Sequence, residues 1–131
     1  MTPNKWITIG AIFGGTAVAL GAFGAHALKG AIEPRMLEVF QTAVRYQMFH
    51  VVAFFVTGVL YQKNPTGVLE KAGYCFLFGT LAFSLSLYAL SLSGIKWLGA
   101  ITPLGGVLLM IGWFLLTLYS IKNSSRGNLR S

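Results

Sequence analysis

Apolar residues run through four long stretches of this 131-residue chain without any Asp, Glu, Lys or Arg. The stretches cover residues 6–28, 46–62, 72–95 and 97–121. A membrane-spanning helix needs roughly 17–25 apolar residues, and every stretch lies at or near that length. The runs are continuous rather than alternating, and so few strands could not close into a membrane barrel. The pattern therefore predicts an all-α protein with four transmembrane helices.

Local signals place the predicted helices at about 6–28, 35–62, 68–93 and 103–122. Gly30 follows the first helix, Pro34 suits the first turn of the second, and Gly94 caps the third. The sequence KNPTG at 63–67 is a turn, while Thr102 and Pro103 either start or kink the last helix. We expect one antiparallel up-and-down bundle over residues 1–122, followed by a polar, disordered tail at 123–131.

Composition and charge agree with a membrane location. Charged residues make up 10% of the chain, against about a quarter in soluble domains. The net charge is +7, but the basic residues are scattered at helix ends, which argues against a nucleic-acid partner. Four spans put both termini on one side of the bilayer. That side carries six basic residues against four, which favours cytoplasmic termini in a cell membrane of the bacterial inner-membrane type.

Small residues recur along the first predicted helix with the spacing of a packing face. One row contains Gly10, Gly14, Ala17, Gly21 and Gly24, and a second contains Gly15, Ala19, Ala22 and His26. Because small residues let helices approach closely in lipid, we expect this helix to be central and to touch two neighbours. The second neighbour belongs either to the same chain or to another copy. Gly105 and Gly112 provide a similar row on the fourth helix.

The sequence AHA at 25–27 raises the alternative of a cleaved signal peptide. The apolar stretch before it is about twenty residues long, however, whereas the apolar region of a signal peptide has 7–15. Its small residues are also patterned for packing. We therefore expect this segment to remain as a helix.

Seven polar side chains are candidates for a binding cluster: His26, Glu38, Arg45, Tyr46, Gln47, His50 and Tyr88. An ionisable group inside a bilayer is costly and suggests function, although a neutral, hydrogen-bonded histidine could equally clamp two helices together. In an antiparallel hairpin Glu38 lies at the depth of His26, so we expect a contact there, with Arg45 nearby. His50 is ~18 Å farther along the helix, opposite Gly14 and Gly15.

This separation argues against a metal held by both histidines, because zinc–nitrogen bonds are ~2.1 Å long. No haem-binding pattern and no other cofactor signature is present, so we expect neither metal nor cofactor. We also predict no catalytic residues and no enzymatic activity. The sequence lacks aspartate, a GxSxG motif and a phosphate-binding loop, and its three glutamates lie near membrane edges.

Four ordered motifs resemble one known family. They are GAFGAHAL (21–28), FQTAVRYQMFH (40–50), FSLSLYALSLSG (83–94), and ITPLGG (101–106) with GW (112–113). Together they are similar to the domain of unknown function 423 family of small multi-pass membrane proteins, over nearly all of residues 6–121. The resemblance implies a four-helix membrane protein and no assigned activity. Leu85 and Ala27 stand where the family pattern favours glycine.

Two classes of function remain. The prediction is a structural, accessory or assembly protein of the lipid bilayer, packed through its Gly and Ala faces in a homo-oligomer or a larger membrane complex. The alternative is a small transporter or binding protein for an ion, a proton or a small molecule, with a polar site around His50, Glu38 and His26. Four short helices without an inverted repeat offer little room for transport, which favours the first class.

Overall fold

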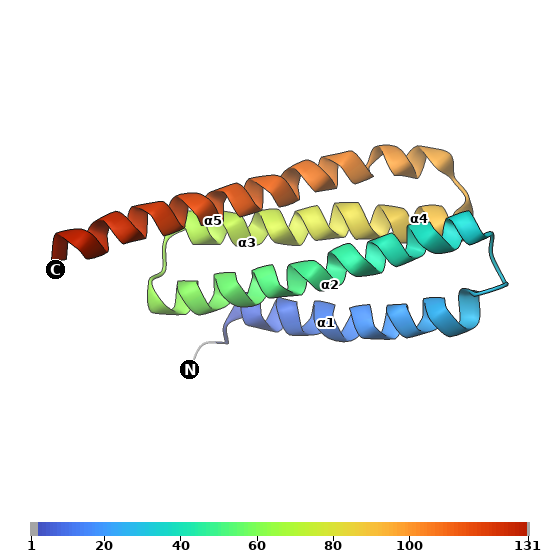
Figure 1. Ribbon diagram of the computed structural model, residues 1–131, viewed down its shortest axis with the longest axis horizontal. Helices are drawn as coiled ribbons and strands as arrows, with labels where there is room; N and C mark the ends of the chain where they lie inside the picture. The colour runs from blue at the N-terminus through green and yellow to red at the C-terminus, as the bar shows by residue number, and fades with distance from the viewer. Residues whose placement is uncertain (1–2, 131) are drawn as a thin grey trace.

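The computed structural model describes residues 3–130, with side chains as far as Ser124. Within that part of the chain it shows four long helical spans and no strand. The spans are Lys5–Leu28, Pro34–Lys63, Gly67–Ser93 and Lys96–Ser124, each long and apolar enough to cross a membrane. The start of the first span and the end of the last lie at the same end of the bundle (Figure 1). The predicted all-α membrane bundle is confirmed.

Three of the four spans are assembled from more than one element. The first span consists of α1 (Lys5–Phe23) and a π-helical turn, η1 (Gly24–Leu28). The second is α2 (Pro34–Lys63). The third consists of α3 (Gly67–Thr80), a π-helical turn η2 (Leu81–Leu85) and α4 (Ser86–Ser93). The last begins with a 3₁₀ turn, η3 (Lys96–Ala100), and continues as α5 (Thr102–Arg130).

Specific residues set the ends of these helices. The side chains of Asn4 and Thr66 cap α1 and α3 by accepting hydrogen bonds from backbone N–H groups one turn on. Pro34 occupies the first turn of α2, where its missing N–H costs nothing. Gly94 ends α4 with a φ of 72°, a conformation that glycine adopts without strain. Except at the C-terminus, the predicted ends lie within one residue of those observed.

The C-terminal end differs from the prediction. We expected a disordered tail at 123–131, but α5 continues through these residues as far as Arg130. The backbone of 123–130 contains no proline, so nothing interrupts the local hydrogen bonds that extend a helix. Residue 131 lies outside the described residues.

The central helix is α2. It packs along α1 on one side and along α3, η2 and α4 on the other, while α5 packs on α3 and η2 (Figure 1). The expectation that the first helix is central is therefore wrong. It packs along α2 and reaches α3 near its own N-terminal end, where Trp6 meets Tyr74 edge to face at 5.0 Å. Its second row of small residues faces away from the bundle.

Glycines in α3 and α5 allow the closest approaches in the bundle. A Cβ atom on Gly73 would lie 2.4 Å from the indole of Trp6, which is fully buried. A Cβ atom on Gly105 would lie 2.4 Å from the backbone nitrogen of Phe83, in η2. Contacts this short leave no room for a side chain. The contact of α3 with Trp6 of α1 and the seam between η2 and α5 therefore both depend on glycine, as expected for tightly packed helices in lipid.

Candidate functional site

The seven predicted site residues do not form one cluster. Gln47, His50 and Tyr88 are buried, while the other four are exposed on the outside of the bundle, namely His26, Glu38, Arg45 and Tyr46. The buried residues belong to two separate hydrogen-bonded groups on different sides of α2. Sequence spacing gave the depth of these side chains but not the helix that each one faces.

His50 joins α2 to α5. Its Nδ1 donates to the backbone carbonyl of Tyr46 at 2.8 Å, one turn earlier, and its Nε2 accepts from Nε1 of Trp113 at 3.0 Å. One neutral tautomer, with the proton on Nδ1, satisfies both bonds. Both ring nitrogens are therefore engaged by the protein, which is the arrangement of a structural clamp.

The position of His50 differs from the prediction. We expected it opposite Gly14 and Gly15 of α1, but Val51 lies against Gly14 and a side chain at Gly15 would meet open space. His50 points toward α5 and α3, where its ring lies 5.7 Å from Trp113 and 6.0 Å from Phe76. One residue along a helix corresponds to 100° of rotation, so His50 and Val51 face different neighbours.

Gln47 joins three helices. Its Nε2 donates to the backbone carbonyl of Phe13 at 2.9 Å and to the hydroxyl of Thr16 at 2.8 Å, both in α1. Its Oε1 accepts from the hydroxyl of Tyr88 in α4 at 2.7 Å. The amide thus uses both its donor and its acceptor within the bundle. Thr16 was not among the predicted site residues.

A cleft of about 260 Å³ opens where α1 diverges from the third span. Phe13, Thr16 and Leu20 line one wall, and Thr80, Ser84 and Tyr88 line the other. Ser84 donates to the backbone carbonyl of Ala43 at 2.8 Å, so most polar groups of the cleft are paired. Thr80 is buried, and its hydroxyl has no hydrogen-bond partner among the described residues.

The expected contact between His26 and Glu38 does not form. Both side chains are exposed, and no hydrogen bond or ion pair joins either of them to another described residue. The two residues were expected at the same depth in the hairpin, but depth alone does not determine which way each side chain points. His26 also lies in the π-helical turn η1, whose wider winding shifts side chains away from the faces of an α-helix. Arg45 is likewise exposed and does not join them.

The first row of small residues on α1 faces α2. Cβ atoms added to Gly10, Gly21 and Gly24 would lie 3.0, 3.4 and 2.9 Å from Phe54, Val44 and Phe40. The same test on Gly14 gives an ordinary contact of 3.6 Å with Val51, and Ala17 is fully buried. On α5, Gly112 makes room for the ring of Phe76, 2.7 Å from an added Cβ atom.

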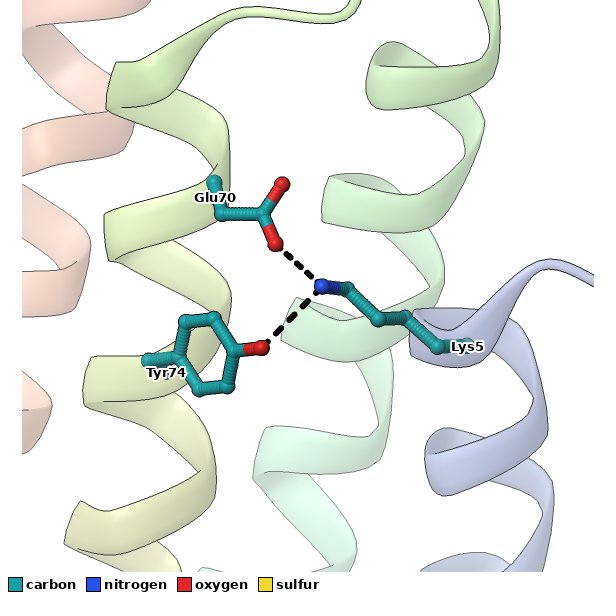
Figure 2. Close-up of polar contacts among 3 residues, drawn as sticks. All are labelled: Lys5, Glu70 and Tyr74. Carbon is teal, nitrogen blue, oxygen red and sulfur yellow. Dashed lines mark hydrogen bonds and ion pairs between the residues drawn. The ribbon is translucent and has the colours of Figure 1, made fainter.

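A polar clamp that was not predicted from the sequence lies at the N-terminal end of α1. Lys5 forms an ion pair with Glu70 of α3 and donates to the hydroxyl of Tyr74 at 3.1 Å (Figure 2). Its ammonium also lies 4.8 Å from the centre of the Tyr74 ring. The partners are 65 positions apart in sequence, so no local pattern could have paired them. The clamp fixes the start of α1 against the third span.

The described part of the chain contains no side-chain group that could hold a metal ion. No three side chains of His, Cys, Asp or Glu come together there. Cys75 is a free, partly buried thiol. The histidine best placed in the interior, His50, has both nitrogens occupied by protein groups. The buried polar residues hold helices together.

Comparison with known proteins agrees with the membrane fold. A family model described as "Protein of unknown function (DUF423)" matches residues 20–106. The chain is 44% identical over 118 residues to UPF0382 membrane protein YwdK of Bacillus subtilis, covering 89% of this chain and 96% of that protein. It is 40% identical over 117 residues to UPF0382 membrane protein SERP0230 of Staphylococcus epidermidis, covering 89% and 95%. No solved structure matches the chain.

Proposed function

Because this chain belongs to the DUF423 family of membrane proteins, we propose that it is a non-enzymatic structural protein of the membrane that assembles with a second copy of itself. The observation that carries this proposal is the outward face of α1. Gly15, Ala19 and Ala22 lie exposed along it, at the spacing of a helix-packing row.

The outward faces of α1 and α5 are built differently. Large apolar side chains cover the outside of α5, including Leu104, Met110 and Phe114, each at least 60% exposed. The centre of the α1 face carries Gly15, Ala19 and Ala22 instead, with the exposed Ile12 and Val18 at its edges. Since lipid tails pack well against large side chains and close helix contacts need small ones, α5 suits lipid and α1 suits another helix. A two-fold contact would place the same small residues of two copies against each other.

The burial of the spans supports the same conclusion. In the most apolar stretch of the first span 17% of residues are buried, against 22% in the last span and 39% in the second and third. The two outer spans are therefore the least covered by their own chain, the first slightly less than the last. The buried polar groups support a structural role too, because a transport path would need side chains free to bind a passing ion or molecule. Gln47 and His50 are bonded to neighbouring helices instead.

Disulfide cross-linking in native membranes tests this assembly. On a Cys75→Ala background, Ala19→Cys places a thiol at the centre of the α1 face. Met110→Cys is the matched control, because it is exposed on α5 and lies eight residues from the start of that helix, as Ala19 lies nine from Leu28. Oxidation should give dimers with Ala19→Cys and few with Met110→Cys. Equal cross-linking of the two variants would contradict the proposal.

A second variant separates assembly from folding. A side chain at Gly15 would meet open space within its own chain, so Gly15→Leu should leave the fold intact while blocking the close approach of two α1 helices. We expect this substitution to abolish the Ala19→Cys cross-link without lowering thermal stability. Retention of the cross-link would show that the α1 row is not the contact.

We also propose that both termini face the cytoplasm in a bacterial-type inner membrane. The support is the excess of basic residues at the end of the bundle that holds both termini. A fluorescent protein fused to the C-terminus should fold and fluoresce, whereas an alkaline phosphatase fusion there should be inactive. The reverse pair of results would invert the orientation.

A further inference from the structure

Arg45 is a cation in a membrane span and has no partner among the described residues. Its side chain is exposed on α2, and no hydrogen bond or ion pair joins it to another described residue. A charged group inside a bilayer is costly unless it reaches a polar or ionic partner. Because none of the described residues supplies one, the surrounding membrane is where a partner for Arg45 is to be sought.

The position of Arg45 places its guanidinium within reach of the bilayer surface. It follows Arg35, near the start of α2, by ten residues, or ~15 Å along the axis. The next residue, Tyr46, stacks on Phe83 at 4.3 Å, and Phe83 meets Gly105 one turn after the start of α5. Arg45 thus lies about three turns, or ~16 Å, from the start of α2. Because α2 has 30 residues and is ~45 Å long, it exceeds a ~30 Å hydrocarbon core, so its first turns reach the headgroup region and the long Arg45 side chain extends toward it.

An open groove of about 480 Å³ adjoins this guanidinium, lined by Arg45, Tyr46 and Phe49. Both aromatic side chains are large and exposed, Phe49 at 62%. Stacking of Tyr46 on Phe83 and the contact of Phe49 with Trp113, at 5.8 Å, connect the groove to η2 and α5. The groove therefore brings the Arg45 side chain next to two exposed aromatic rings that pack on η2 and α5.

We propose that this groove binds one anionic phospholipid, with the phosphate on Arg45 and an acyl chain across Tyr46 and Phe49. A guanidinium donates two parallel hydrogen bonds to phosphate oxygens, which makes arginine well suited to this group. The aromatic floor matches the hydrocarbon that continues from the same molecule. Glu38 is the carboxylate on the same face of α2, but it lies seven residues, or ~10 Å, nearer the start of the helix and so leaves the groove to the phosphate.

Native mass spectrometry of delipidated protein in detergent tests the site with dioleoylphosphatidylglycerol as the probe. We expect one lipid to bind the unmodified chain more tightly than any further lipid. Arg45→Gln should weaken this first affinity about tenfold, the effect of losing a charge-assisted hydrogen bond. Arg45→Lys should weaken it less, because the charge remains. Phe49→Ala should weaken binding severalfold, and since Phe49 is exposed this truncation opens no core cavity.

Arg35→Gln is the matched control, because Arg35 is an exposed arginine on the same helix that lines no part of the groove. Its affinity for the lipid should equal that of the unmodified chain. Equal losses in Arg35→Gln and Arg45→Gln would overturn the proposal in favour of general attraction to basic residues. Dioleoylphosphatidylcholine should bind more weakly because its ammonium offsets the phosphate. Displacement of the lipid by millimolar inorganic phosphate would show that the acyl chain contributes nothing, and would also overturn it.

Discussion

Replacing Gly105 with alanine should destabilise the bundle because a single methyl group has no space at the α5 seam. The new Cβ atom would lie 2.4 Å from the backbone nitrogen of Phe83 and 2.9 Å from the carbonyl oxygen of Gly79. Ordinary contact begins near 3.4 Å, so the two backbones must separate by about 1 Å at this point. Backbone atoms cannot rotate out of the way as a side chain would. The neighbouring contact of Leu109 with Gly79 lies on the same seam and would open with it.

The expected cost follows from two opposing effects. Overpacking of a tight interior costs about 1–3 kcal/mol, and displaced backbone places Gly105→Ala toward the upper end of this range. Alanine favours the helix over glycine by ~1 kcal/mol, which offsets part of the loss. Gly106→Ala gains the same helix preference, but its Cβ atom would meet the Phe83 ring at 3.9 Å, an ordinary contact. The two neighbouring variants should therefore differ by about 2–3 kcal/mol in free energy of unfolding.

Reversible unfolding in mixed micelles, followed by far-ultraviolet circular dichroism, measures this difference. Gly106→Ala should be neutral or more stable than the unmodified chain, and Gly105→Ala less stable. Since the two substitutions are chemically identical and adjacent, effects of the detergent and of helix preference cancel in the comparison. If the two free energies agreed within ~0.5 kcal/mol, the range typical of surface substitutions, the close approach of α5 to η2 would be refuted.

Three further experiments test the polar contacts. Thr80→Val should be neutral or stabilise the protein by ~1 kcal/mol, because it removes a buried hydroxyl without a partner. Thr57→Val is its control and should destabilise the protein by loss of the 2.7 Å hydrogen bond to Ala53, and thermal unfolding in detergent compares the two variants. Trp113→Phe should lower the free energy of unfolding by ~1–3 kcal/mol, because it leaves Nε2 of His50 unpaired. A double-mutant cycle with His50→Phe tests this, since the loss should be smaller when the histidine is absent. Lys5→Gln should lower the free energy of unfolding by less than ~1 kcal/mol, and added salt should reduce this difference, because the ion pair with Glu70 is partly exposed. Chemical unfolding at two salt concentrations measures both effects, and a larger or salt-independent loss would contradict the prediction.

The sequence was sufficient for the spans but not for their neighbours. Uninterrupted apolar runs and local signals such as Pro34 and Gly94 predict the ends of the first three spans to within a residue, because both depend on nearby residues in the chain. The central position of α2 depends instead on which faces meet. The two small-residue rows on α1 look alike in sequence, yet one faces α2 and the other faces outward.

The candidate site shows the same division between local and long-range information. Polarity within a span directed attention to Gln47 and His50, but their partners Thr16 and Trp113 lie 31 and 63 positions away. A tryptophan inside a span usually seeks an acceptor for its N–H, and this was the available signal for Trp113. The expected contact of His26 with Glu38 is absent for another reason. His26 lies in a π-helical turn, whose wider winding turns its side chain away from the face that an α-helix would give it, and the sequence carries no reliable mark of such a turn.

The Lys5–Glu70 clamp also bears on the order in which the chain enters the bilayer. Its two members are 65 positions apart, so a ribosome adding 5–20 residues per second makes the second about 3–13 s after the first. During that interval α1 can pair with α2 along its glycine row, but its N-terminal end has no third helix to bind. Arrival of α3 supplies Glu70 and Tyr74 and covers Trp6. Insertion of the third span is thus the step that closes the first hairpin into a bundle.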